Sequence, residues 1–179
     1  MTQEEFIKLC AEGDYVEITD TILDEHIDVN KPAIINGIPT YPMFVAASSG
    51  NLDTVWALSD QGADNADGFI AATIAGNVEL LKWLVRCTHD INSLDRNGNS
   101  ALLTAVTMNN PDMVDILIEL GADVNVKSER GSTPLVYAAM IAAEREDESR
   151  IPRTVNHRII NALVKNGAFH GDAMYLSFN

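Results

Sequence analysis

Apolar side chains recur along this chain with the spacing of one helix face. The pattern is clearest in two stretches, Val78-Leu80-Leu81-Leu84-Val85 and Met113-Val114-Ile116-Leu117-Leu120, where apolar residues return at intervals of about 3.6 positions. A shorter stretch carries Leu135, Ala138 and Ala139 on one face, and its alanines let a neighbouring helix approach closely. The pattern predicts short helices paired with longer ones.

The helical stretches lie between landmarks that repeat. Gly98 in segment 95–105 corresponds to Gly131 in segment 128–138, 33 positions later. The run at 120–125, Leu-Gly-Ala-Asp-Val-Asn, recurs in part at 61–64, at 166–168 and, more weakly, at 88–92. Self-similarity at a fixed period of this length is typical of stacked repeat proteins.

Each repeat reads as a turn, a short helix, a loop and a longer helix. Gly98 and Gly131 supply positive φ in the turn, and Thr133-Pro134 is a typical helix start. Gly62 and Gly121 are expected to have positive φ where the longer helices end. One unit cannot bury its apolar face alone, so the predicted fold is an all-α repeat solenoid.

The runs Gly-Ser-Thr-Pro-Leu-Val-Tyr-Ala-Ala at 131–139 and Leu-Gly-Ala-Asp-Val-Asn at 120–125 resemble the ankyrin repeat family. The resemblance covers nearly the whole chain and implies helix pairs with β-hairpin fingers, in a family that mostly binds proteins through fingertips and a concave groove. The position between the two helices of each repeat falls at Gly13, Gly50, Gly76, Asn109 and Ala142. We therefore expect one domain, 1–179, with five repeats and a C-terminal capping tail, at approximately 1–30, 31–65, 66–92, 93–125, 126–170 and 171–179.

The spacing departs from the family's period in three places. The third finger is expected to be missing, because residues 64–69 leave too little chain for a hairpin, while the second finger, at 31–42, should be enlarged. The insertion at 142–155 predicts a lengthened inner helix that ends before Pro152, although a solvated charged loop is the alternative. The tail after Phe169 either caps the last repeat or binds a partner.

The resemblance also implies where a partner protein would bind. The groove positions with apolar or partly apolar side chains are Ile74, Thr107, Met108, Met140 and Ile141. The fingertips would add a polar rim of Arg96, Asn97, Asn99, Glu129, Arg130 and Ser132. The competing interpretation is that the second finger covers Ile74 and the lengthened helix covers Ile141.

Charge narrows the range of partners. The net charge is −14, and residues 1–66 hold 12 acidic and 2 basic side chains. Such a surface repels nucleic acid, and either steers a basic partner or is simply a solvated face. The longest apolar stretch, 69–85, is interrupted by polar residues, so no membrane span is expected. An acidic N-terminus argues against a signal peptide, so we expect a cytoplasmic protein, with a secreted effector as the alternative. We also expect the protein to be a monomer.

The sequence contains no group of residues spaced as in a catalytic or metal-binding site. Four histidines, His26, His89, His157 and His170, each occur singly, and the calcium-loop match beginning at Ser93 ends on Thr104 instead of a glutamate. Cys10 and Cys87 are both expected to be buried, reduced thiols. We therefore expect no cofactor, no metal and no catalysis, but a non-catalytic adaptor or scaffold. The alternatives are a small-molecule or enzyme-like site in the groove, and a delivered effector acting on host proteins.

Overall fold

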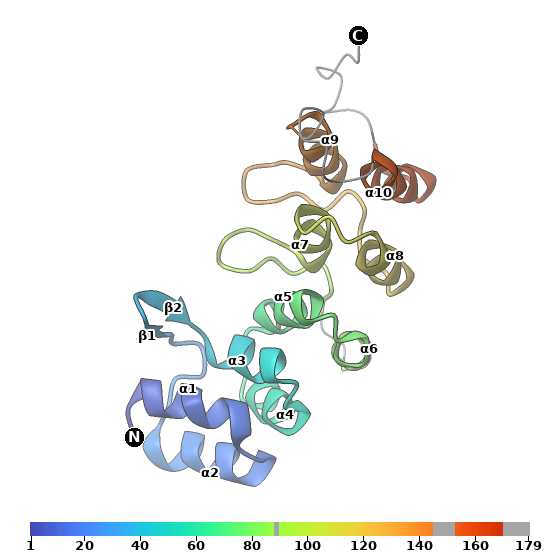
Figure 1. The fold of residues 1–179 in the computed structure, drawn as a ribbon. Coiled ribbons are helices and arrows are strands. Elements are labelled where there is room, and N and C mark those ends of the chain that lie inside the picture. Colours follow the sequence, from blue (N-terminus) through green and yellow to red (C-terminus); the bar gives the residue numbers. More distant parts are fainter. Residues whose placement is uncertain (88–89, 145–152, 170–179) are drawn as a thin grey trace. The chain divides into compact units, whose positions relative to one another are not determined.

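The computed structural model of the chain defines residues 1–87, 90–144 and 153–169. Within these ranges it contains ten helices and one two-stranded sheet (Figure 1). The helices divide into two compact units, Met1–His89 and Asp90–Asn179. The predicted all-α repeat solenoid is confirmed, because the helices follow one another as pairs of an inner and an outer helix.

The N-terminal unit contains three helix pairs and the sheet. Its inner helices α1, α3 and α5 pack against one another in order, and the outer helix α2 packs against α4 (Figure 1). The elements are α1 (Gln3–Glu12), α2 (Tyr15–Glu25), β1 (Ala33–Ile35), β2 (Ile38–Thr40), α3 (Pro42–Ser49), α4 (Leu52–Asp60), α5 (Asn65–Ala75) and α6 (Val78–Arg86).

Polar side chains start most of these helices. Thr2 and Glu5 form a reciprocal capping box at α1, and Asp14 accepts a hydrogen bond from the Glu17 backbone at the start of α2. Asn51 and Asn77 cap the outer helices α4 and α6 in the same way. Each cap satisfies a backbone N–H that the first helical turn leaves without a partner.

The core of the N-terminal unit lies between successive pairs. Phe6, Ile18, Met43, Leu58 and Phe69 are almost fully buried there. Hydrogen bonds also connect the second helix pair to the first. The Asn51 side chain and the buried Thr54 hydroxyl both donate to the Gly13 carbonyl oxygen, at 2.7 and 2.9 Å. The ends of the repeats are therefore held together by packing and by hydrogen bonds.

The second finger is a β-hairpin. β1 and β2 pair antiparallel, with Ile34 opposite Pro39 and Ile35 opposite Ile38, around a turn at Asn36-Gly37. It occupies the 31–42 segment in which an enlarged finger is expected. At the following junction, α5 starts at Asn65 with Asp64 as its cap. Residues 65–69 are therefore helical where a third hairpin would otherwise lie.

The C-terminal unit contains two helix pairs. Inner helix α7 packs against α9, and outer helix α8 packs against α10 (Figure 1). Leu102, Leu103, Val114 and Leu117 are buried between the pairs. The four helices are α7 (Ala101–Thr107), α8 (Pro111–Glu119), α9 (Pro134–Glu144) and α10 (Arg153–Lys165).

Several local predictions are confirmed. Leu135, Ala138 and Ala139 are buried on α9. The Thr133 hydroxyl accepts a hydrogen bond from the Val136 N–H at 3.4 Å, and α9 starts at Pro134. Gly62 and Gly121 have φ of 81° and 97°, as expected after the outer helices.

The lengthened inner helix of the fifth repeat stays a prediction. The described α9 has 11 residues, more than the 7 of α7 but as many as α5. The remainder of the insertion, at 145–152, and the tail at 170–179 lie outside the described residues, so the interpretations of both segments stay predictions. The repeat boundaries and the assignment of all five repeats to one domain also stay predictions.

A recurring asparagine joins neighbouring repeats. The Asn125 amide donates to the Gly167 carbonyl at 3.1 Å, and its side-chain oxygen accepts from the Phe169 N–H at 2.9 Å. Asn30 makes the equivalent pair of bonds with the Gly62 carbonyl and the Asp64 N–H. Because each asparagine bonds just past the end of the next outer helix, it sets the spacing between repeats.

Candidate functional site

Four of the five expected groove residues belong to the inner helices of the C-terminal unit. Met108 and Met140 are 46% and 45% exposed, and Thr107 is also exposed, whereas Ile141 is half-buried. Thr107 ends α7 and Met108 caps it, whereas Met140 and Ile141 lie in the middle of α9. The helices α7 and α9 pack against each other in the C-terminal unit. The structure thus presents two methionines to solvent from neighbouring helices.

Ile74 belongs to the other unit. It lies in the last turn of α5, next to the C-terminal cap Gly76, and is 49% exposed. The second finger, in the same unit, therefore leaves half of the Ile74 side chain uncovered. The alternative in which this finger hides Ile74 is wrong.

The predicted fingertip residues come from two loops of the C-terminal unit. Asp95 shapes the first loop, because its carboxylate accepts the backbone N–H groups of Asn97 and Asn99 at 2.9 and 2.8 Å. The second loop closes through the Ser128 N–H, which donates to the Ser132 carbonyl at 2.9 Å. Among the predicted rim residues, the exposed ones are Arg96, Asn97, Glu129 and Arg130, and the half-buried ones are Asn99 and Ser132.

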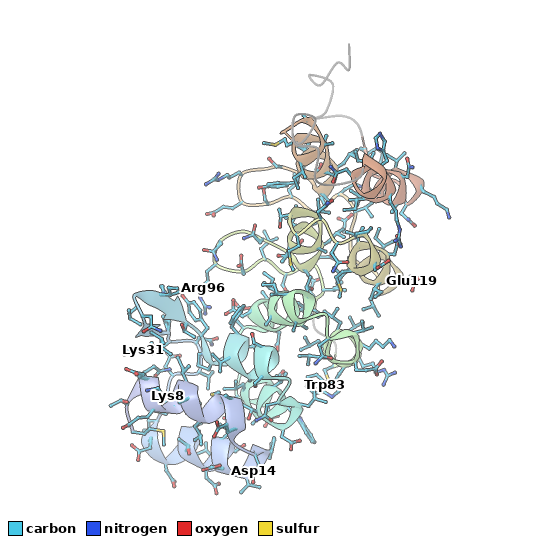
Figure 2. All side chains as sticks on the ribbon, in the orientation of Figure 1. Lys8, Asp14, Lys31, Trp83, Arg96 and Glu119 are labelled. Carbon is cyan, nitrogen blue, oxygen red and sulfur yellow. The ribbon has the colours of Figure 1, made fainter. Side chains whose placement is uncertain are left out.

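The two loops touch each other. The Glu129 N–H donates to the Gly98 carbonyl oxygen at 3.3 Å. Figure 2 labels Arg96 at the tip of the first of these loops. The structure therefore brings the two groups of polar fingertip residues onto adjacent loops of one unit.

Sequence reasoning missed two exposed apolar residues on the second finger. Ile34 is 63% exposed and Ile38 is 65% exposed, on the two strands of the hairpin. The signal was present, because apolar side chains in a projecting finger have no core to enter. These residues extend the exposed apolar surface of the N-terminal unit.

One expectation about the cysteines is wrong. Cys10 is buried in α1, and this burial raises the pKa of its thiol to about 12. Cys87 is exposed. It stands three positions after the buried Leu84, but α6 ends at Arg86, so Cys87 leaves the helix as its cap and does not continue the buried stripe.

Asp95, at the third position of the calcium-loop match, stabilises the repeat turn, since its carboxylate accepts hydrogen bonds from backbone N–H groups. Within residues 1–87, 90–144 and 153–169, no group of three or more His, Cys, Asp or Glu side chains is arranged to hold a metal ion. None of the helices in these ranges combines the length and apolar composition of a membrane span.

Successive helix pairs joined by finger loops define a helical repeat protein. The family model for ankyrin repeats, three copies, matches residues 69–169. This match covers more than half of the chain, and the chain therefore belongs to the ankyrin repeat family. Ankyrin repeats are in general non-enzymatic modules for protein–protein interaction.

Similar proteins match this chain over a small part of their own length. The chain is 29% identical over 126 residues to ankyrin repeat and SAM domain-containing protein 6 of Rattus norvegicus, which covers 66% of the chain and 14% of that protein. It is 45% identical over 69 residues to the potassium channel AKT1 of Arabidopsis thaliana, covering 37% and 8%. It is 26% identical over 149 residues to human ankyrin repeat domain-containing protein 13C, covering 78% and 25%. The chain thus spans a quarter or less of each of these proteins.

Proposed function

We propose that this chain is a non-catalytic adaptor or scaffold that binds another protein through the concave groove along its inner helices and through its fingertips. The observation that carries the proposal is the exposure of Met108 and Met140, at 46% and 45%, on neighbouring helices of one unit. At a position that only faces water, a polar side chain would be hydrated more favourably than an apolar one. Apolar side chains gathered on one face are typical of an interaction surface.

The chemistry of this surface suits a protein partner. Methionine is flexible and polarisable, so it adapts to the shape of the surface that it contacts. The exposed fingertip residues Arg96, Asn97, Glu129 and Arg130 add hydrogen-bonding groups at the edge. An apolar centre with a polar rim is the usual anatomy of a protein interface, in which the centre supplies affinity and the rim supplies specificity.

The oligomeric state, the cellular location and the domain organisation are proposed from the composition and the family. We infer a monomer in the cytoplasm whose repeats form one continuous domain. The net charge of −14 disfavours nucleic acid as the partner, because phosphates would be repelled.

The test is Met108→Glu, with Val164→Glu as a matched control. Val164 is 39% exposed on the outer helix α10, so the control adds the same charge to the same unit away from the inner helices. Affinity capture from the native lysate followed by mass spectrometry identifies a partner. Calorimetry then measures the dissociation constant of that partner for the wild type and for each of the two variants.

We expect Met108→Glu to weaken binding by about 2 kcal/mol, roughly thirtyfold, with a stability change within about 0.5 kcal/mol. Val164→Glu should bind like the wild type. Unfolding of the Met108 variant would show that this residue is structural. An unimpaired complex of a folded Met108 variant would place the partner elsewhere.

A further inference from the structure

The outer helices of the N-terminal unit carry an aromatic depression that plays no part in the groove. Its lining residues are Trp56, Ser59, Asp60, Trp83 and Cys87, and its volume is about 280 Å³. Trp56 belongs to α4 and Trp83 to α6, and they are the two tryptophans of the chain. Figure 2 labels Trp83 on α6.

A residue from a third helix supports Trp56. The rings of Tyr15, at the start of α2, and Trp56 lie 5.2 Å apart between centroids and are inclined at 48°. The Tyr15 hydroxyl also donates to the Asp60 carboxylate at 3.5 Å. Trp56 nevertheless stays 55% exposed. An indole that is held from one side and still open to solvent is preorganised for a ligand.

The charge along α2 and α4 has one sign. These two helices contain no basic residue, whereas α6, on the other side of the depression, carries Lys82 and Arg86. The acidic residues of α2 and α4, all exposed, are Glu17, Asp20, Asp24, Glu25, Asp53 and Asp60. In the described part of the chain, the hydrogen-bond partners of the Asp60 carboxylate are Tyr15 and Gln61, both uncharged and both at 3.5 Å. The Asp60 charge is therefore not neutralised by a neighbouring cation there.

The same two helices also expose apolar side chains. Val16 and Leu23 on α2 are 63% and 57% exposed, and Leu52 on α4 is 44% exposed. Since α2 packs against α4, their outward side combines apolar residues with acidic ones. The complementary ligand has apolar and basic side chains on a single face.

We propose that the outer side of α2 and α4 is a second docking surface, which binds a basic amphipathic segment of a partner protein. An arginine of that segment lies on the Trp56 indole and pairs with the Asp60 carboxylate. The guanidinium stacks on an aromatic face and donates two hydrogen bonds to a carboxylate, so one side chain satisfies both groups. The acidic residues along α2 attract the other basic side chains.

The probe is a helix-forming peptide with arginines on one face and leucines on the other. The control peptide carries glutamine in place of every arginine. Because both tryptophans line the depression, intrinsic fluorescence reports directly on its occupation. We expect a saturable fluorescence change with the arginine peptide only. Equal binding of the glutamine peptide, or no binding of the arginine peptide, would overturn the proposal.

Substitutions distinguish binding of the arginine peptide at this site from its nonspecific attraction to an acidic protein. Asp60→Asn and Trp56→Leu should each weaken the peptide's affinity, measured by calorimetry, by about tenfold. The matched control Glu119→Gln removes one charge from α8, in the other unit, and should change the affinity less than about twofold. Equal losses for Asp60→Asn and Glu119→Gln would reduce the effect to net charge and refute the site.

The conservative Asp60→Asn exchange at an exposed position keeps this test decisive if Trp56→Leu fails to fold. Met108→Glu should bind the arginine peptide with unchanged affinity, since Met108 belongs to the other unit. A failure of this docking surface is therefore distinguishable from a failure of the groove.

Discussion

Gly98 packs so closely against Glu129 that position 98 has no room for a side chain. A Cβ built on Gly98 would lie 2.8 Å from the Glu129 backbone nitrogen, and the Glu129 N–H already donates to the Gly98 carbonyl. Gly98 also has φ of 73°, in the left-handed region that favours glycine. Conformation and packing thus both require glycine where the two fingers meet.

Replacing Gly98 by alanine should therefore destabilise more than the same change at Gly131. Gly131 has φ of 80° but open space around it, so Gly131→Ala should cost only the left-handed strain, about 1 kcal/mol. Gly98→Ala adds a steric clash, for a total of about 2–4 kcal/mol. Urea unfolding of the two variants compares the costs directly, and equal values would show that the contact between fingers contributes nothing.

Asn125 should matter to stability although it binds no partner in our proposal. Asn125→Ala removes the bonds to the Gly167 carbonyl and the Phe169 N–H, and we expect a loss of about 1–2 kcal/mol. Asn97→Ala is the control, because the Asn97 side chain is exposed and bonds to Asp95 within its own turn. Thermal or urea unfolding measures both, and a similar small effect for the two would argue against the link between repeats.

The two cysteines should differ sharply in reactivity. The Cys10 thiol is buried and its pKa is raised to about 12 by desolvation, so it stays protonated at neutral pH. Cys87 is exposed. At neutral pH we expect a thiol reagent to modify Cys87 in the native protein, and Cys10 only after unfolding. Mass spectrometry of digested, labelled protein locates the label, and rapid native labelling of Cys10 would contradict the burial.

Glu5 should titrate below its ordinary pKa of 4.5, because the Thr2 backbone N–H and then the Thr2 hydroxyl hydrogen-bond with its carboxylate. A carboxyl whose pKa is lowered on folding contributes stability that is present above its unfolded pKa and is lost as pH falls through the folded pKa. Carboxyl NMR shifts measured against pH give the value. Thr2→Ala should raise this pKa only in part, since the backbone donor remains. A wild-type pKa at or above 4.5 would refute the capping box.

Much of the fold can be predicted from the sequence because it is local. The 3.6-residue spacing places Leu80, Leu81 and Leu84 on the buried face of an outer helix, and the predicted burial of Leu135 and Ala138 follows from the same rule. The positive φ of Gly62 and Gly121 is likewise a property of a helix end. Each feature depends on residues a few positions apart, and the repeat then copies it along the chain.

The tertiary structure decided what depends on distant residues. Cysteine is usually buried, and Cys87 follows an apolar helical stretch, so burial was expected; the end of α6 exposes it instead. Trp56 and Trp83 come to line one depression, and Tyr15 joins Trp56, only because helices from successive repeats pack side by side. A periodic pattern states which face of a helix is buried. Which side chains meet on the outer face depends on the offset between repeats, and this offset is set by packing together with the hydrogen bonds between repeats.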